Sequence, residues 1–333
     1  MGEPGAHARS SGLSGAVALV TGAAGFVGSH LVERLVGAGA AVRAVDSLTA
    51  YYSVEQKRRT LDALRQLSGC AVIEADLRTS DLAHLVDGAD LVFHQAGQPG
   101  VRASWQGFGD YLGHNVLATQ RLLAAVQDSG IRRFVYASSS SVYGEAARHP
   151  TVEGSVPRPV SPYGVTKLAA EHLCGVFAGL GVPSVSLRYF TVYGPRQRPD
   201  MALHRLIDAA LSGTPFPLFG DGRQVRDLTY VDDVIEANIS AGATEALTPG
   251  AVLNIAGGTV TDLRGLIELV EELTGRPIAI DRRPAQPGDV RATSGSTALA
   301  AEALGWRPRV SLRVGVAEQV AWHASRTRLE RSA

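Results

Sequence analysis

The chain has 333 residues and a formal net charge of zero, with 32 Lys plus Arg against 32 Asp plus Glu. This length suits a large α/β domain with an added lobe, and the balanced charge excludes a protein drawn by its overall field to nucleic acid or to an anionic membrane. Two cysteines without a CxxC pair exclude a disulfide framework and a thiolate zinc site, and they favour a cytoplasmic location.

The predicted elements begin after residues 1–14, which have no apolar core and are expected to form a disordered lead-in. Short apolar runs that predict strands covered on both faces lie at 16–20, 41–46, 71–77, 89–97, 132–139 and 184–190. Helix-like segments separate these runs, starting with 26–38. This alternation predicts an α/β fold with a Rossmann-type doubly wound parallel sheet. No run reaches the ~18 apolar residues of a membrane span, so no membrane contact is expected.

Past residue 190 the pattern loosens into Pro- and Gly-rich stretches, interrupted by a strand-like run at 251–258. This change predicts a smaller C-terminal lobe that is interleaved with the first domain. We expect the first domain to cover 15–190 and to regain 231–258, and the lobe to cover 191–230 and 259–325.

The first predicted turn has the features of a dinucleotide site. Gly22, Gly25 and Gly28 follow the first strand and lead into the first helix, where glycines let the backbone turn tightly and approach a pyrophosphate. Asp46 ends the second strand, where a carboxylate accepts hydrogen bonds from both adenosine ribose hydroxyls and repels a 2′-phosphate. NAD is therefore favoured over NADP, and the alternative is a Rossmann-like sheet without cofactor. The remaining residues expected at the cofactor are Phe26, Val27, Asp76, Leu77, Ala96, Gly97 and Asn115.

A candidate reactive centre lies in "SPYGVTKLAAEHL". Ser161 is the predicted N-cap, and Tyr163 and Lys167 lie four residues apart on one helix face. A tyrosine with a pKa of about 10 needs a decrease of about 3 units, or about 4 kcal/mol, to act as a base near neutrality. One solvated lysine supplies only about 1 kcal/mol. The site is therefore expected to be partly desolvated and to share the positive charge of an oxidised nicotinamide. Tyr163 and Lys167 on a merely solvated helix face are the alternative.

These motifs, with "SSSSVYG", "RYFTVYGPRQRP" and "VRDLTYVDD", resemble the extended short-chain dehydrogenase/reductases that act on nucleotide sugars, over residues 16 to 325. "YYSVEQKRR", "HQAGQPGVRASW" and "TVYGPRQRPDMA" most resemble the UDP-glucuronate 4-epimerases within that group. The resemblance implies tightly held NAD, a catalytic set of Ser139, Tyr163 and Lys167, and a homodimer through helices around 115–128 and 163–180. It also implies that the first domain binds NAD and that the C-terminal lobe binds the nucleotide sugar.

Oxidation of a hexuronate at C4 gives a β-keto acid, which loses carbon dioxide readily unless its carboxylate is held out of alignment with the new carbonyl. A guanidinium grips a carboxylate with two hydrogen bonds. We assign Arg198 to the carboxylate, with Thr191 beside it, and Arg102 to the other side of the sugar. Arg188 is expected to pair within the structure, and Arg196 suits a surface or an interface equally well.

The serines upstream of the predicted helix at Tyr163 bear on which reaction the site catalyses. Related dehydratases and decarboxylases resemble "TDEVYG" or "TSEVYG", whereas this chain has Ser140 and Ser141 where their acids stand. Without those acids the site is poorly equipped for elimination or for protonating a decarboxylated product. Which of Ser139, Ser140 and Ser141 contacts the reacting hydroxyl stays open. For the UDP end, the resemblance indicates Arg226, Asp289 and Arg291, although Gln286 stands where related hexose epimerases often have arginine.

The expected activity is NAD-dependent conversion of UDP-glucuronate to UDP-galacturonate through a transient 4-keto sugar. The nearest alternative is a UDP-glucose/UDP-galactose 4-epimerase or another nucleotide-sugar epimerase with the same catalytic set. A second alternative, from another class, is a non-catalytic NAD-sensing module that binds a partner protein. Such modules can lack the tyrosine and lysine, and both are present here.

Overall fold

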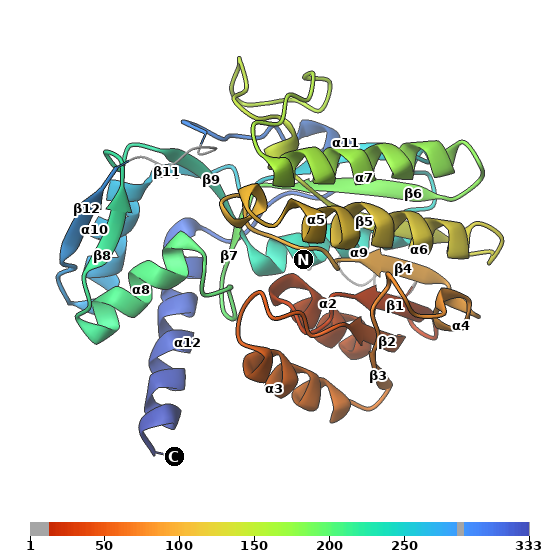
Figure 1. Cartoon of the computed structure of the whole chain (residues 1–333), viewed down its shortest axis with the longest axis horizontal. Helices are drawn as coiled ribbons and strands as arrows, with labels where there is room; N and C mark the ends of the chain where they lie inside the picture. The colour runs from red at the N-terminus through yellow and green to blue at the C-terminus, as the bar shows by residue number, and fades with distance from the viewer. Residues whose placement is uncertain (1–12, 285–289, 333) are drawn as a thin grey trace, which may run out of the picture.

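Parallel strands form the central sheet of the chain, which the computed structural model describes over residues 13–284 and 290–332 (Figure 1). The sheet has seven strands in the order β10-β6-β5-β4-β1-β2-β3, and each neighbouring pair is parallel. Their bounds are β1 Val17–Thr21, β2 Ala41–Asp46, β3 Cys70–Glu74, β4 Leu91–His94, β5 Arg133–Ser139, β6 Ser184–Tyr189 and β10 Ala251–Ile255. The predicted Rossmann-type doubly wound sheet is confirmed. Residues 1–12 of the expected disordered lead-in lie outside the described residues.

Helices cover both faces of this sheet, because its strands are apolar on both sides. One face carries α2 (Phe26–Gly37), α3 (Val54–Arg65), α9 (Val231–Ala243) and α11 (Ala298–Leu304). The other carries α4 (Leu82–Val86), α6 (Ala118–Val126) and α7 (Pro162–Ala178). Short elements lead into α6 or follow β5: η1 (Ala103–Trp105), α5 (Phe108–Tyr111), the π-helical turn η2 (Leu112–Leu117) and the 3-10 turn η3 (Ser140–Val142).

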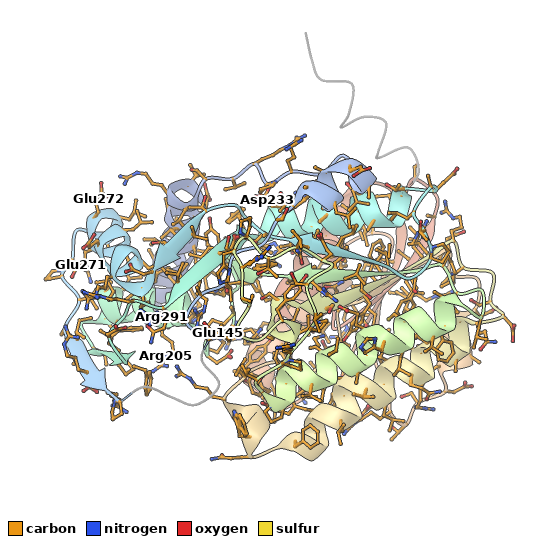
Figure 2. The ribbon with its side chains drawn as sticks, turned by 90° about the horizontal axis from the view of Figure 1, so that it is seen from above. Glu145, Arg205, Asp233, Glu271, Glu272 and Arg291 are labelled. Atoms are coloured by element: carbon orange, nitrogen blue, oxygen red, sulfur yellow. The ribbon has the colours of Figure 1, made fainter. Side chains whose placement is uncertain are left out.

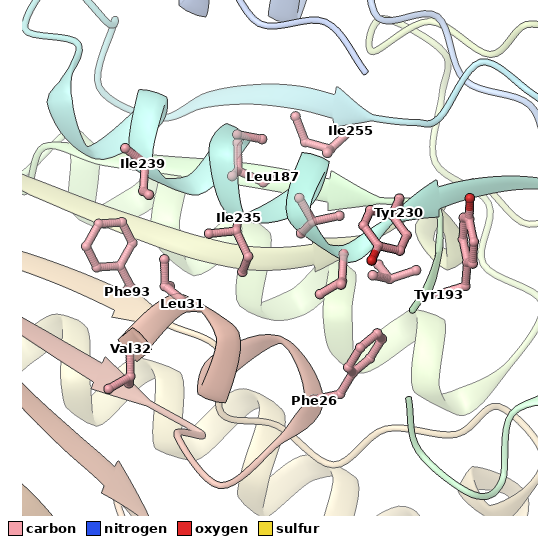
Figure 3. Packing of buried hydrophobic residues seen from close by; sticks show 14 of the residues in the cluster. Phe26, Leu31, Val32, Phe93, Leu187, Tyr193, Tyr230, Ile235, Ile239 and Ile255 are labelled. Atoms are coloured by element: carbon pink, nitrogen blue, oxygen red, sulfur yellow. The ribbon is translucent and has the colours of Figure 1, made fainter. Parts of the chain in front are cut away.

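The largest cluster of buried hydrophobic side chains packs α2 against α9 over the sheet. Figure 3 shows Leu31 and Val32 of α2 beside Phe93 of β4, with Ile235 and Ile239 of α9 above them. All five side chains are buried. Burial of such a side chain stabilises a fold by about 1.5–3 kcal/mol. This packing fixes α2, whose first turn faces the carboxyl ends of the strands.

The C-terminal lobe contains two small sheets, one with the order β11-β9-β7 and one that pairs β12 with β8. Its strands are β7 (Thr191–Tyr193), β8 (Phe216–Phe219), β9 (Val225–Tyr230), β11 (Val260–Asp262) and β12 (Ile280–Arg283). Its helices are α8 (Ala202–Ser212), α10 (Leu263–Thr274) and α12 (Leu312–Ser332). The chain leaves the large sheet after β6 and returns as its edge strand β10. In the described part of the chain no helix is both long and apolar enough to cross a membrane.

Three strands, β3, β4 and β10, end three residues earlier than their apolar runs predicted. The pairing of β3 with β2 stops at Glu74 opposite Asp46, and the Asp76 carboxylate then accepts the amide of Arg78, which closes a turn. β4 stops at His94, and the segment after it leaves the sheet because buried Asn115 binds both backbone groups of Gln98. The ends of β3 and β4 therefore become loops over the sheet.

Candidate active site

A cavity of about 830 Å³ runs along the carboxyl ends of β1 to β6. The strand order reverses between β1 and β4, and open α/β sheets bind their ligands in the crevice at such a reversal. The C-terminal lobe closes the other side through β7, β8, β9 and the start of α8. One cavity therefore touches both lobes.

The cavity is more cationic than the chain as a whole. Among its lining residues six are Lys or Arg and three are Asp, whereas the whole chain is neutral. The cations are Lys57, Arg102, Lys167, Arg198, Arg205 and Arg226, and the acids are Asp46, Asp76 and Asp200. A low-dielectric cleft with this excess attracts anionic ligands.

The start of α2 fits a dinucleotide. Gly22 has φ 72°, and a Cβ there would lie 2.7 Å from the Ala96 amide nitrogen, so only glycine fits. A Cβ on Gly28 would lie 2.1 Å from the Gly22 carbonyl oxygen. No side chain caps the first turn of α2, whose amides and dipole favour a phosphate. Asp46 is oriented by the amides of Ala24 (3.0 Å) and Leu48 (2.8 Å), which leaves its carboxylate at the cavity wall.

Most predicted cofactor residues line this cavity: Gly22, Gly25, Phe26, Val27, Gly28, Asp46, Asp76, Leu77, Ala96, Gly97, Tyr163 and Lys167. Asn115 does not line it. Asn115 lies beneath the loop and holds Gln98, so it shapes the cavity floor from behind. The Asp76 carboxylate pairs with Arg78 at 2.7 Å, so its orientation is set by this partner.

The predicted catalytic residues come together from β5 and α7. Ser161 caps α7 by accepting the Gly164 amide at 3.1 Å, with Pro162 at the first helical position, and this start places Tyr163 and Lys167 at the cavity. The Lys167 ammonium donates to the Ala137 carbonyl of β5 at 2.6 Å. Ser139 ends the same strand and lines the cavity. The three side chains, from two elements that pack together, therefore line one cavity.

Burial acts against both ionised forms in this group. It raises the pKa of Tyr163, which the hydrogen bond from Ser139 partly offsets. It lowers the pKa of Lys167 to about 8, although Cys174 and Glu171 oppose the decrease. Burial therefore disfavours the phenolate of Tyr163, and a further positive charge is needed to make the tyrosine a base.

The predicted sugar-side residues line the same cavity: Arg102, Ser139, Ser140, Ser141, Thr191, Arg198 and Arg226. Arg102 places its guanidinium 4.4 Å from the centre of the Phe219 ring. Arg188 lies elsewhere, in a buried ion pair with Glu171 at 2.5 Å. Arg196 binds Glu33 of α2 with two hydrogen bonds and thereby joins the C-terminal lobe to the first domain.

The arrangement of these groups agrees with the comparisons to known proteins. Residues 18–256 match the model of the NAD dependent epimerase/dehydratase family. The chain belongs to this family. It is 41% identical over 92% of its length to a Bacillus subtilis (strain 168) protein called "Uncharacterized UDP-glucose epimerase YtcB", of which 98% is covered.

Two solved structures are similar to this family member over nearly their whole length. One is UDP-glucuronic acid 4-epimerase from Bacillus cereus in complex with UDP-glucuronic acid and NAD, with a TM-score of 0.90 and 39% identity over 93% of this chain and 99% of the other. The other is MoeE5 in complex with UDP-glucose and NAD, with a TM-score of 0.86 and 42% identity over 94% of this chain and all of the other.

Among the predicted UDP ligands of this family member, Arg291 does not line the cavity. Arg291 is exposed, and its backbone amide donates to the carboxylate of Glu145 at 2.9 Å; Figure 2 shows the two residues next to each other. Asp289 and Gln286 lie outside the described residues. Arg226, the other predicted phosphate ligand, lines the cavity.

Several cavity residues were missed by the sequence analysis, among them Tyr51, Asp200 and Arg205. Arg205 lies on α8, and its pKa is lowered by burial and by Arg102 and Arg283 nearby, as expected for a cation among cations. Arg205 could have been found from the sequence, because it lies one turn into a helix that directly follows the Arg198 loop. Tyr51 and Asp200 meet only through the fold, since 149 positions separate them.

Proposed function

We propose that this protein is an NAD-dependent UDP-glucuronate 4-epimerase, which interconverts UDP-glucuronate and UDP-galacturonate. The observation that carries the proposal is the meeting of two sets of residues in one cavity: Ser139, Tyr163 and Lys167 on one wall, and Arg198 with Thr191 on the other. The first set suits proton transfer at a sugar hydroxyl. The second suits a carboxylate on the same sugar.

In this proposal residues 15–190 and 231–258 bind NAD, and 191–230 and 259–325 bind the UDP-sugar. NAD held at the start of α2 would supply the acceptor for the C4 hydride. Tyr163 takes the C4 hydroxyl proton and gives it back, Lys167 stabilises the phenolate, and Ser139 donates to the same oxygen. Arg226 and Arg205 provide positive charge for the diphosphate and Arg102 faces the sugar, so the sugar can turn over while UDP stays in place.

Arg198 has a second task in this reaction. The 4-keto uronate is a β-keto acid, and it loses carbon dioxide when its C5–C6 bond aligns with the carbonyl π system. A guanidinium that grips the carboxylate at a fixed angle keeps this bond out of alignment. Ser140, Ser141 and Thr191 add hydroxyl groups to the wall of the same cavity.

The test is to supply purified protein with UDP-glucuronate and, separately, with UDP-glucose, and to identify the products by NMR. We expect UDP-galacturonate from the first and much slower conversion of the second. The name of the Bacillus subtilis relative favours the alternative, a UDP-glucose 4-epimerase. Efficient conversion of UDP-glucose without conversion of UDP-glucuronate would establish that alternative.

Asp46→Asn is expected to reduce the preference for NAD over NADP by about tenfold or more, because the variant loses a charged acceptor for the ribose and the repulsion of a 2′-phosphate. Titration of NAD-stripped protein with each dinucleotide measures this preference. Asp81→Asn is a control, since Asp81 caps a helix outside the cavity. An unchanged NAD to NADP ratio in Asp46→Asn would remove Asp46 from the cofactor site.

The proposal includes a cytoplasmic homodimer, and exposed apolar side chains support the dimer. Leu112, Leu117, Val165 and Val176 are 42–61% exposed on η2 and α7, which lie side by side (Figure 1). We expect light scattering to give the mass of two chains for the wild type. Leu117→Glu should shift the mass toward one chain, whereas Leu299→Glu, at an exposed leucine on α11, should leave it unchanged. A wild-type mass of one chain would contradict the dimer.

A further inference from the structure

Arg198 does not face the cavity alone. Its Nε donates to Asp200 Oδ1 at 3.0 Å, and its Nη2 donates to Asp200 Oδ2 at 3.1 Å. Asp200 thus occupies one edge of the guanidinium with two parallel hydrogen bonds. Neither bond uses Nη1, which belongs to the opposite edge. Both residues line the cavity, with side chains 21% and 34% exposed.

Asp200 is held in turn from the first domain. The Tyr51 hydroxyl, in the loop after β2, donates to Asp200 Oδ2 at 3.2 Å. Tyr51 packs on Gly100, where a Cβ would lie 2.0 Å from the Tyr51 oxygen and where φ is 97°. The hydroxyl of Tyr111 donates to the Gly100 carbonyl at 2.8 Å, which fixes the loop below. The position of Asp200 is therefore set by three segments from the two lobes.

The residues before Arg198 are fixed as well. Arg196, at φ 65°, is bound to Glu33. The Gln197 side chain donates to Val192 and accepts from Gln319, and its carbonyl lies 2.7 Å from His204 Nδ1. Pro199 restricts Arg198 to extended backbone. With the backbone fixed on both sides, the remaining freedom of Arg198 is in its side chain, which Asp200 restrains.

The carboxylate of Asp200 is ionised near neutral pH. Burial would raise its pKa, but Arg198 and the Tyr51 hydroxyl together bring the pKa below its usual value. The pair therefore compensates the arginine charge before any substrate arrives. A side-on carboxylate also fixes the plane of the guanidinium, because both bonds lie in that plane.

We propose that Asp200, held by Tyr51, is a positioning residue that orients Arg198 toward the substrate carboxylate and so suppresses decarboxylation of the 4-keto uronate. Asp200 touches neither sugar nor cofactor in this proposal. The inference rests on the proposed function, because it concerns the angle at which a uronate carboxylate is held. In an alternative model, Asp200 only competes with the substrate carboxylate for Arg198 and is displaced when the substrate binds.

The side reaction that Asp200 suppresses, here called the leak, is decarboxylation of the 4-keto uronate. Tyr163 has taken the hydroxyl proton and the hydride has gone to NAD. The C5–C6 bond then breaks, its electron pair passes through C5 into the C4 carbonyl, carbon dioxide leaves, and C5 gains a proton from solvent. The sugar is left as a 4-keto pentose without the returned hydride. Each leak event therefore releases one carbon dioxide and leaves one reduced cofactor.

The experiment compares Asp200→Asn, Asp200→Glu and Tyr51→Phe with the wild type, using UDP-glucuronate and UDP-glucose. We expect Asp200→Asn to raise the fraction of turnovers that release carbon dioxide by about tenfold, since small misplacements of a reacting group change rates by up to about 10². Reduced cofactor should accumulate in parallel at 340 nm. Asp200→Glu should lie between wild type and Asp200→Asn, and Tyr51→Phe should show a smaller increase.

Asp281→Asn is the control, because Asp281 and Arg283 form an ion pair two residues apart on β12, with Nε to Oδ2 at 2.8 Å, and neither lines the cavity. An unchanged fraction of released carbon dioxide in Asp200→Asn would overturn the inference. Tighter binding of UDP-glucuronate by Asp200→Asn, with an unchanged fraction of turnovers that release carbon dioxide, would also overturn it. That result would show that Asp200 only competes with the substrate for Arg198. Wild-type protein that does not convert UDP-glucuronate would instead refute the proposed function itself. If Asp200→Asn does not fold, Tyr51→Phe decides by the same measurement.

Discussion

Tyr163→Phe is expected to lower turnover of UDP-glucuronate by about 10³-fold or more, within the range that a general acid–base contributes. The hydroxyl of Tyr163 is the proton acceptor in the proposed reaction, and Tyr163 lines the same cavity as Ser139 and Lys167. Removing one oxygen leaves the ring and the capped start of α7 in place. The measurement is the initial rate of UDP-galacturonate formation at saturating substrate, followed by NMR.

A suitable control is Tyr193→Phe, because Tyr193 is buried in the C-terminal lobe, away from the cavity wall, and its hydroxyl approaches the Leu312 carbonyl at 3.5 Å. This variant should keep wild-type turnover. Tyr163→Phe should also keep its NAD, which is measured as the dinucleotide released on denaturation. Activity near the wild-type level in Tyr163→Phe would show that another group accepts the proton.

The electrostatics of the site explain why the loss of turnover in Tyr163→Phe should be large. Burial raises the pKa of Tyr163, and burial lowers the pKa of Lys167 to about 8. Both shifts oppose a phenolate next to an ammonium ion, so the spacing of the two residues on α7 does not by itself create a base. The oxidised nicotinamide supplies the missing positive charge when NAD is bound.

The first domain could be predicted because its signals are local. The run that became β1 is apolar and buried, and the start of α7 is set by Ser161 and Pro162. Strand ends were less predictable, because they depend on the partner strand. β3 stops where Asp46 of β2 stops pairing, although its apolar run continues.

In the candidate site, too, local features could be predicted and features that depend on distant segments could not. Tyr163 and Lys167 share one helix face, so their proximity follows from sequence spacing. Arg198 was assigned by its residue type, but its partner Asp200 and the hydrogen bond from Tyr51 depend on how the C-terminal lobe meets the first domain. Arg291 stays a prediction: its motif suggested a phosphate ligand, and in the structure it is exposed beside Glu145 and does not line the cavity.

Arg198→Ala is expected to lower kcat/KM for UDP-glucuronate by about 10²–10³-fold, because removing one member of a desolvated charge pair costs about 2–5 kcal/mol. The loss has two physical parts. The substrate carboxylate loses its guanidinium, and Asp200 is left as an uncompensated negative charge within the same cavity. UDP-glucose carries no carboxylate, so its kcat/KM should change by only about threefold. Steady-state kinetics with both sugars measure the difference.

A double variant separates these two parts. Arg198→Ala with Asp200→Asn removes the repulsion as well as the guanidinium, so it should regain about tenfold of the loss in kcat/KM for UDP-glucuronate, because contacting residues are not additive. The carbon dioxide released per turnover should stay high, since nothing then holds the carboxylate at a fixed angle. Equal losses for both sugars in Arg198→Ala would remove the carboxylate from this arginine. A double variant no better than Arg198→Ala would show that Asp200 does not repel the substrate, and the loss would then come from the guanidinium alone.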